Sequence, residues 1–407
     1  MSLGIPRALR AWAFSDIEGL GAPMVFVSGA RQVGKTFVAR QLPASYFNLD
    51  TVEVRKAFAK DPYFFRGANR VVVFDEVHKR RDWKKLLKGY YDSPDRAENF
   101  VVTGSGRLTQ YQRSGDSLQG RYHACQLWPL SPDEIHAGAG RRLQPAQPRD
   151  WRRWVPLARA EPDGELIRMG GFPAPFLSGR ITTLRRWQDE YVDRLVREDV
   201  RDFSAVQRLD QMDLLARMLP DRVGAPLSVL SLARDLEAST VGVKSWIRLF
   251  EVLFLGFLLR PYHRKIHRAV KKEPKWYFQQ WTFVENEGAR FENYVAVQLA
   301  SACSAWSEQG FGRWELFYLR DQDRREVDFL IARDLKPRAL VETKLSPQNW
   351  PSALAHYCRR LDVPGFLVYP EGPIQRHERL GWKVPSGSFL RGLLLVPPGE
   401  TWGDADR

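Results

Sequence analysis

The segment GARQVGKT, residues 29–36, constrains the fold of this chain more than any other part of the sequence. It matches the pattern G-x-x-x-x-G-K-[ST] at every fixed position, and it lies between an apolar run at residues 24–28 and a helical pattern at residues 37–41. Glycines in such a loop let backbone N–H groups approach phosphate oxygens, and the loop joins a buried strand to a helix. We therefore expect an α/β domain with a phosphate-binding loop after its first strand.

Most positions of this loop are expected to contact a nucleotide. These candidate contacts are Gly29, Ala30, Gln32, Val33, Gly34, Lys35 and Thr36. We expect Lys35 to neutralise the β and γ phosphates and Thr36 to ligate Mg²⁺. The alternative is a glycine-rich turn without a ligand, which the strand–loop–helix context disfavours.

Two further strand patterns end in polar residues. The run VVVFDEVH delivers Asp75 and Glu76 to the carboxyl end of a buried strand, where α/β sheets bind ligands. We expect Asp75 to hold Mg²⁺ through water and Glu76 to polarise the water that attacks the γ-phosphate. The run FVVTGS ends in Thr103 and Ser105, which suits a sensor of the γ-phosphate; for either residue alone, a simple turn is equally compatible.

The composition bears on partners and compartment. A formal charge of +14 over 407 residues favours a polyanionic partner such as nucleic acid, although solubility or membrane-surface binding would also account for it. The three cysteines show no CxxC spacing, so neither a zinc site nor a disulfide framework is indicated. The longest apolar stretch, residues 252–259, is too short to span a bilayer. We expect a cytoplasmic protein without membrane association.

The length and the pattern changes predict three domains, at residues 1–150, 151–280 and 281–407. Short apolar runs in the first alternate with mixed segments, as in a parallel sheet covered by helices. A Pro- and Arg-rich stretch at 141–153 connects it to a helical middle region. The third domain starts with a helix and continues with strand patterns, which indicates a second α/β domain.

The middle region predicts a winged helix that binds DNA. Two helical patterns within residues 227–259 are broken at 237–239, and two strand patterns follow, joined by a basic loop. Lys244 and Arg248 lie four apart on the face opposite Trp246, where phosphate or base contacts would be made. The candidate DNA contacts in the basic loop are Arg264, Lys265, Arg268, Lys271 and Lys272. The alternative for each of these residues is an ordinary solvated charge.

Three charged residues in the third domain predict a metal site. The segments 326–332 and 339–345 have the period of strands, which puts Glu342 and Lys344 on one face. If they pair about a centre near Leu335, Asp328 faces Glu342 across the hairpin. Two such close carboxylates repel unless a cation lies between them, so we expect Mg²⁺, or alternatively Mn²⁺. An exposed cross-strand salt bridge is the competing interpretation.

Beyond these patterns, residues 24–134 resemble the AAA-type ATP-binding domain of prokaryotic proteins with a DUF4143 C-terminal region. The matching stretches, besides the two phosphate motifs, are YFNLD, VVTGSGR, SLQGR and PLSPDE. Counted together with the C-terminal DUF4143 region, the resemblance to these proteins covers nearly the whole chain. It implies that Arg121 contacts the γ-phosphate, either in cis or in trans as an arginine finger; the sequence alone equally permits a surface arginine.

The third domain similarly resembles the restriction-endonuclease-like PD-(D/E)xK core, with Asp328 as the aspartate and Glu342-Thr343-Lys344 as the ExK. Glu292, on the preceding helical pattern, matches the acidic residue that often completes such a site. The resemblance implies metal-assisted phosphodiester hydrolysis, with Lys344 orienting the attacking water. Val327 stands where the pattern's name has proline, a departure common in that family.

Together these parts predict an ATP-hydrolysing, DNA-binding enzyme that cleaves or remodels DNA, including branched or junction structures. The rival hypothesis is a nucleotide-driven switch whose nuclease-like domain grips DNA or protein without cleavage. The intact set of Asp328, Glu342 and Lys344 favours the enzyme. A homo-oligomer is compatible with the sequence, and ring assembly stays open.

Overall fold

The computed structural model describes residues 5, 7–14, 24–77, 80, 82–93, 95, 97–104, 106, 118, 120–137, 144–156, 162–203, 208–263, 272–347 and 349–396. The chain divides into two compact units. The N-terminal unit comprises residues 7–128 and 252–254, and the C-terminal unit comprises residues 1–6, 129–251 and 255–407. The middle and third predicted domains thus belong to one unit.

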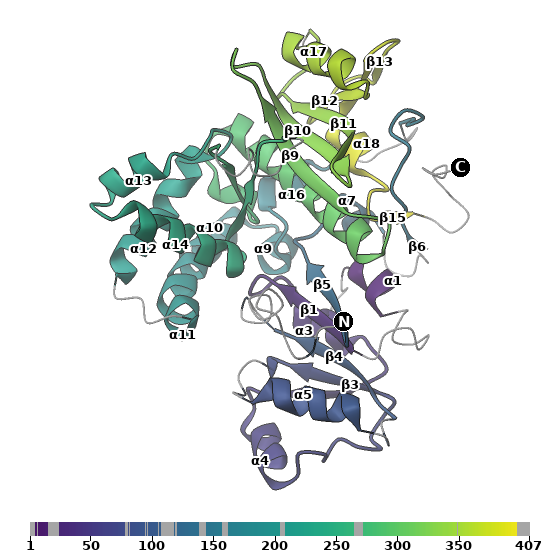
Figure 1. The fold of residues 1–407 in the computed structure, drawn as a ribbon, viewed down its shortest axis with the longest axis vertical. Helices are drawn as coiled ribbons and strands as arrows, with labels where there is room; N and C mark the ends of the chain where they lie inside the picture. Colours follow the sequence, from purple (N-terminus) through teal and green to yellow (C-terminus); the bar gives the residue numbers. More distant parts are fainter. Residues whose placement is uncertain are drawn as a thin grey trace. The chain divides into compact units, whose positions relative to one another are not determined.

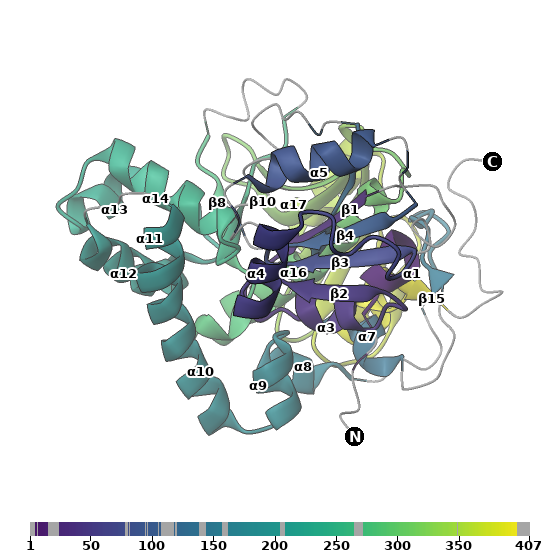
Figure 2. The ribbon, with the colours of Figure 1, turned by 90° about the horizontal axis from the view of Figure 1, so that it is seen from below.

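The N-terminal unit is built on a five-stranded parallel sheet of order β2-β3-β4-β1-β5. Its strands are β1 (Met24–Gly29), β2 (Ser45–Asn48), β3 (Val71–Asp75), β4 (Asn99–Thr103) and β5 (His123–Leu127). Figure 2 shows β2, β3, β4 and β1 side by side. Because all the pairs are parallel, the carboxyl ends of β1, β3 and β4 meet at one edge. The predicted parallel α/β domain is confirmed.

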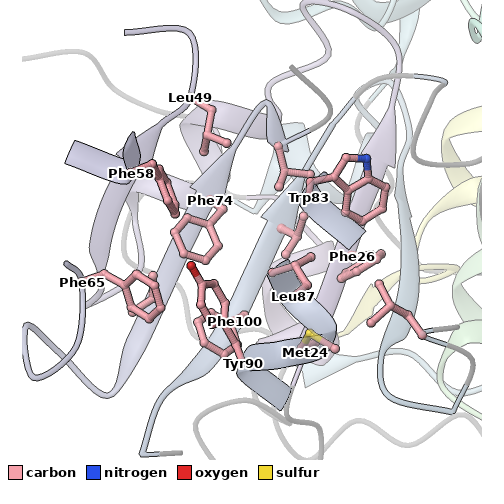
Figure 3. Packing of buried hydrophobic residues seen from close by; sticks show 14 residues of the cluster. Met24, Phe26, Leu49, Phe58, Phe65, Phe74, Trp83, Leu87, Tyr90 and Phe100 are labelled. Carbon is pink, nitrogen blue, oxygen red and sulfur yellow. The ribbon is translucent and has the colours of Figure 1, made fainter. Parts of the chain in front are cut away.

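Alternate residues of these strands give the sheet an aromatic face. Phe26, Phe74 and Phe100 pack there with residues of α4 (Val52–Lys60) and α5 (Trp83–Asp92). Figure 3 shows their rings gathered with those of Phe65 and Tyr90. The Phe74 and Phe100 rings are stacked, with centroids 5.7 Å apart. Burial of several large aromatic side chains against one face is a major source of this unit's stability.

The phosphate-binding loop connects β1 to α3 (Lys35–Arg40), which packs against β1, β3 and β4. Val38 and Ala39 of α3 are fully buried. The unit also contains the short helix α1 (Leu9–Ala13), which lies against β5.

The first helix of the C-terminal unit is α7 (Pro132–His136). Ser131 accepts a hydrogen bond from the Glu134 N–H, and the Glu134 carboxylate accepts one from the Ser131 N–H. This reciprocal capping box satisfies two N–H groups at the helix end that lack helical partners. A short antiparallel pair, β6 (Gln144–Pro145) with β15 (Leu395–Val396), follows.

Helices dominate the unit up to residue 251 (Figure 1). They are α8 (Gly164–Met169), α9 (Pro173–Ser178), α10 (Ile181–Arg194), η2 (Leu195–Asp199), α11 (Val200–Phe203), α12 (Leu209–Met218), η3 (Leu219–Arg222), α13 (Val229–Asp235) and α14 (Thr240–Val252). The strands β7 (Gly256–Leu259) and β8 (Lys275–Phe278) then pair antiparallel. The predicted sequence of helix, turn, helix and hairpin is therefore present as elements, with Glu237 at positive φ in the turn.

A six-stranded mixed sheet forms the rest of the unit, in the order β13-β14-β12-β11-β10-β9. After the short helix η4 (Trp281–Phe283) come α16 (Glu287–Glu308), β9 (Trp314–Arg320), β10 (Glu326–Arg333), β11 (Lys336–Thr343), α17 (Ser352–Leu361), β12 (Gly365–Tyr369), β13 (Gln375–His377), β14 (Gly381–Pro385) and α18 (Ser386–Leu390). Strands β9, β10 and β11 are antiparallel neighbours, whereas β12 pairs parallel with both β11 and β14. Helix α16 packs against β9, β10 and β11, and α17 packs against β10, β11 and β12 (Figure 1).

Two findings bear on what the sequence analysis says of membranes and of cysteines. None of the helices in the described chain combines the length and apolar character that crossing a bilayer requires. Cys125, Cys303 and Cys358 are free and buried.

The aromatic face generates a stability prediction. Phe74→Ala should destabilise the N-terminal unit by about 3–5 kcal/mol, because it leaves a cavity among rings that cannot collapse into it. Hydrogen–deuterium exchange should show lost protection in β3 and β4 and unchanged protection in β11 and β12. Phe37→Ala on α3, where the side chain is 37% exposed, is the control. Parental protection of β3 and β4 in Phe74→Ala would contradict this account of the core.

Candidate functional site

The phosphate-binding loop depends on two glycines. Gly34 has φ 107° at the N-cap of α3, a conformation that residues with a Cβ rarely adopt. A Cβ on Gly29 would come within 2.5 Å of the Leu127 carbonyl oxygen on β5. Both positions of the pattern therefore have a steric reason to be glycine. Ala30 and Val33 are fully buried, and Gln32 has positive φ.

Lys35 is only 6% exposed although it carries a charge. Its ammonium donates hydrogen bonds to the carbonyl oxygens of Gly29 (3.0 Å) and Ala30 (2.8 Å). The cation thus lies inside the curve of the loop. A phosphate bound in the loop would meet a positive charge there.

A buried carboxylate, Asp75, joins the loop to the neighbouring strands. Its Oδ2 accepts hydrogen bonds from the Thr36 hydroxyl (2.7 Å) and the Tyr46 hydroxyl, and its Oδ1 accepts one from the Thr103 hydroxyl. Asp75 is 1% exposed. The two residues expected to hold Mg²⁺, Thr36 and Asp75, are therefore in direct contact. An aspartate and a hydroxyl oxygen are suitable donors for that ion, which prefers one or two carboxylates together with phosphates and water.

Glu76 follows Asp75 in a strained conformation. Its φ is 56°, in the left-handed region, and its N–H donates to the Thr103 hydroxyl at 3.4 Å. Non-glycine residues in this region cost free energy and cluster at functional sites. The strain turns the chain at the carboxyl edge of the sheet, where Glu76 is expected to act on water. Ser105, the other expected phosphate sensor, lies outside the described residues.

Two residues of this site escaped the sequence analysis. Burial and the hydrogen bond to Asp75 raise the pKa of Tyr46 to about 12, so its hydroxyl remains a proton donor to the carboxylate. Arg7, which is buried, donates to the Val33 carbonyl (2.6 Å) and the Trp128 carbonyl, and so ties the loop to residues far away in sequence. The available signal for Tyr46 was its place in the stretch YFNLD; for Arg7 there was none.

Arg121 lies at the other end of the sheet from the loop. The parallel register pairs Val25 with His123 and Gly29 with Leu127, so Arg121 precedes the amino end of β5. Its guanidinium contacts the Asp92 carboxylate at 3.2 Å. A phosphate in the loop of the same chain therefore lies beyond the length of β5. Contact with the γ-phosphate, if made, requires a second copy of the chain.

In the C-terminal unit, a β-bulge sets the position of Asp328. The turn at Asp334 and Leu335 pairs Arg333 with Lys336 and Ala332 with Pro337, but Arg338 on β11 is an extra residue, so Ile331 pairs with Ala339. Beyond the bulge, Phe329 pairs with Val341, which puts Asp328 opposite Glu342. Since a one-residue slip moves side chains to the other face, the bulge is what brings the two acids together.

At this point between β10 and β11, backbone N–H groups donate hydrogen bonds to the two carboxylates. The Asp328 N–H donates to Glu342 Oε2 (3.3 Å), and the Thr343 N–H and hydroxyl donate to Asp328 Oδ2 (2.8 and 2.7 Å). The Lys344 ammonium donates to Glu342 Oε1 at 2.8 Å. Asp328 and Glu342 are 9% and 7% exposed, which excludes the exposed salt bridge considered above.

Burial and the nearby charge of Asp328 raise the pKa of Glu342 to about 7. This repulsion is what a divalent cation would relieve. Among the described residues there is no group of three or more His, Cys, Asp or Glu side chains placed to hold a metal ion. Two carboxylates nevertheless suit Mg²⁺ or Mn²⁺, which take the rest of their ligands from water and substrate phosphates.

Glu292 on α16 is held by residues from the hairpin. Its Oε1 accepts hydrogen bonds from the Tyr277 hydroxyl (2.6 Å) and the Lys275 ammonium (3.3 Å), both on β8. Burial and the charge of Asp328 raise the pKa of Glu292 to about 7. The described residues do not group Glu292 with Asp328 and Glu342 as a third metal ligand, so its predicted role as a ligand stays a prediction. Lys275 and Tyr277 were missed because nothing in their strand pattern signals a distant carboxylate.

The predicted DNA contacts are only partly described. Lys244 and Arg248 are exposed on α14, whereas Trp246 and Phe250 of the same helix are buried. Lys272 is exposed and its ammonium lies 3.5 Å from the Arg320 carbonyl oxygen. Arg264, Lys265, Arg268 and Lys271 lie outside the described residues.

Three family models match separate parts of the chain. Residues 21–136 match a family described as AAA domain, residues 164–280 match a domain of unknown function (DUF8612), and residues 287–385 match a domain of unknown function (DUF4143). The chain carries an AAA-type P-loop domain. The DUF4143 match confirms the second part of the resemblance noted in the sequence.

The curated relatives and the solved structures that resemble this chain share little sequence identity with it. The uncharacterized proteins Rv2008c of Mycobacterium tuberculosis and Mb2031c of Mycobacterium bovis are each 21% identical over 335 residues, covering 78% of this chain and 69% of theirs. Among solved structures, the Walker-type ATPase PABY2304 of Pyrococcus abyssi has a TM-score of 0.40 at 13% identity, covering 69% of this chain and 95% of its own. The DNA clamp loader delta protein of Bacillus subtilis has a TM-score of 0.21 at 12% identity, covering 60% and 88%.

The hydrogen bonds of Asp75 generate a prediction for Thr103→Val, which keeps shape but removes the hydroxyl. Asp75 loses a donor and the Glu76 N–H loses its acceptor, at a cost of about 1.5–3 kcal/mol for a bond to a charged group. ATP turnover should fall about tenfold or more. Steady-state phosphate release measures it, with Thr182→Val, at an exposed position of α10, as the control. Unchanged turnover in a folded Thr103→Val protein would mean that this contact does not position the site.

Proposed function

We propose that this chain is an ATP-hydrolysing, DNA-binding enzyme that cleaves or remodels DNA through a metal-dependent site in its C-terminal unit. The observation that carries the cleavage part is the buried pair Asp328 and Glu342 with Lys344 bonded to it. The AAA-type domain supports the ATPase part. The two phosphate chemistries use different residues in different units.

In the ATPase part, each residue of the loop edge has a proposed role. Lys35 neutralises charge on the β and γ phosphates from inside the loop. Thr36 and Asp75 would hold Mg²⁺, which supplies charge stabilisation to the phosphates when bound. Glu76 orients and polarises the attacking water at the γ-phosphate. Arg121 of a second copy would add positive charge there.

In the nuclease part, Asp328 and Glu342 would hold Mg²⁺ or Mn²⁺, whose contribution is to polarise a phosphodiester and lower the pKa of water. Lys344, beside Glu342, orients the attacking water and offsets charge that develops on the phosphate. The element order of α16, β9, β10, β11, α17 and β12, with both acids on the central antiparallel pair, agrees with the PD-(D/E)xK resemblance.

DNA is the proposed partner because of charge and element order. The net charge of +14 favours a polyanion, and exposed Lys244 and Arg248 lie on the second helix of the helix–turn–helix. The hairpin β7–β8 follows directly. Affinity for duplex DNA should therefore be largely independent of sequence and of the acidic cluster.

The deciding experiment incubates the full chain with plasmid and branched DNA in Mg²⁺ or Mn²⁺, with and without ATP. Cleavage products that disappear in EDTA support the enzyme. Binding of every substrate in an ATP-sensitive way, with no cleavage of any, would replace the enzyme with the rival, a nucleotide-driven switch.

The ATPase assignment predicts that Glu76→Gln keeps ATP binding but stops hydrolysis, because the amide cannot accept a proton. Lys35→Ala should instead lose both. Filter binding of ATP and phosphate release separate the two steps, and the loss of turnover in Glu76→Gln should reach about a hundredfold or more. If Glu76→Gln hydrolyses ATP at the parental rate, another residue polarises the water.

The nuclease assignment predicts that Asp328→Asn or Glu342→Gln abolishes metal-dependent cleavage and leaves ATP hydrolysis largely intact. Lys344→Ala should slow cleavage by about 10²–10³, the usual cost of one lost charge-stabilising group, and spare metal binding. Lys336→Ala, an exposed lysine on the same strand β11, is the matched control. DNA affinity should survive all these changes and fall steeply with salt. Cleavage at the parental rate in Asp328→Asn would remove this site from the mechanism.

A further inference from the structure

Lys275 is a fully buried lysine, and its charge is paired with acids. Its ammonium lies 2.6 Å from Glu326 Oε1 and 3.3 Å from Glu292 Oε1, and its residue is 0% exposed. Burial alone lowers the pKa of a lysine, but the charges of Glu292, Asp328 and Glu326 outweigh it and raise the pKa of Lys275. Lys275 is therefore a permanent cation inside the acidic cluster.

Glu292 is enclosed by these contacts. Tyr277 and Lys275 both bond to its Oε1. On the other side Gly224, at φ 82°, approaches so closely that a Cβ there would lie 3.1 Å from Glu292 Oε2. The carboxylate that the sequence analysis treats as a metal ligand thus bonds to Tyr277 and Lys275 through Oε1 and has Gly224 beside Oε2.

The charges around the cluster are nearly balanced without any metal ion. Among the described residues, its ion pairs join three carboxylates to three cations: Glu292, Glu326 and Glu342 with Lys275, Arg320 and Lys344. Asp328 is the fourth carboxylate, and it accepts hydrogen bonds from Thr343. The one remaining negative charge is on the Asp328 and Glu342 side, where Lys344 is the cation in contact. A bound substrate phosphodiester adds a second negative charge, and one divalent ion offsets both. A second divalent ion would leave the cluster with an excess of positive charge.

We propose that Lys275 takes the place of a second divalent ion, so that the acidic cluster binds a single metal ion through Asp328 and Glu342. The inference rests on the proposed metal-dependent function and specifies it. Glu292 is then a positioning residue that fixes Lys275, with Tyr277 fixing Glu292. The buried ammonium of Lys275 neutralises Glu292 and Glu326, the carboxylates that a second ion would otherwise bind, and unlike a bound ion it cannot dissociate.

The test counts Mn²⁺ on the full chain without nucleotide, by equilibrium dialysis with electron paramagnetic resonance of the free ion. The parent should bind one Mn²⁺ per chain that Asp328→Asn loses. Lys275→Met should bind two, because Glu292 and Glu326 then lack their shared cation. Lys336→Met, which removes an exposed lysine of the same unit, should still bind one. Two Mn²⁺ on the parent, both lost in Asp328→Asn, would overturn the inference.

A second variant guards against misfolding of Lys275→Met, since a buried acid left without its partner is strongly destabilising. Glu292→Gln keeps the shape and the hydrogen-bonding atom that faces Tyr277 and Lys275. It should still bind one Mn²⁺, with affinity within about threefold of the parent, because Glu292 is not a ligand. A loss of about tenfold or more would show that Glu292 ligates the ion and would overturn the inference.

The outcomes also separate this inference from the proposed function. If the parent cuts DNA and binds two ions, the inference alone fails. If the parent neither cuts DNA nor binds Mn²⁺ at Asp328, the metal-dependent function fails, and the inference with it.

Discussion

The hydrogen bonds to Asp75 determine the geometry of the N-terminal unit's functional edge. One buried carboxylate accepts from Thr36 after β1, Tyr46 on β2 and Thr103 at the end of β4. A buried carboxylate is costly unless several donors satisfy it, so these strands can only assemble in a register that supplies all of them. The same atoms that satisfy Asp75 are those suited to an ion and a nucleotide. Stability and function therefore depend on one arrangement of the sheet.

Much of this unit was predictable from the sequence because its signals are local. The glycines at 29 and 34 are required by backbone conformation and close approach, and the runs at β1, β3 and β4 are apolar on both faces. The strand order, with β4 between β1 and β3, and the contacts of Tyr46 and Arg7 were not predictable. They depend on contacts between residues far apart in the chain, which a pattern of nearby residues does not encode.

The acidic cluster shows the same limit more sharply. Alternation along two strands was enough to expect Asp328 near Glu342, and the structure brings them together. The pairing nevertheless depends on a bulge at Arg338 of β11, since the turn alone would place Asp328 opposite Val341. The contribution of Lys275 and Tyr277 had no local signal at all, because they come from a hairpin that the sequence analysis assigned to another domain. The structure unites that hairpin and the cluster in one unit.

The central claim is that Asp75 and Thr36 form the metal-dependent half of a nucleotide site. Isothermal titration of the full chain with ATP, in Mg²⁺ and in EDTA, tests it most directly when repeated on Asp75→Asn. The account predicts one site per chain, with clearly tighter binding in Mg²⁺ for the parent and little or no effect of Mg²⁺ for Asp75→Asn. Failure to bind ATP at all, or a Mg²⁺ effect that persists undiminished in Asp75→Asn, would contradict it.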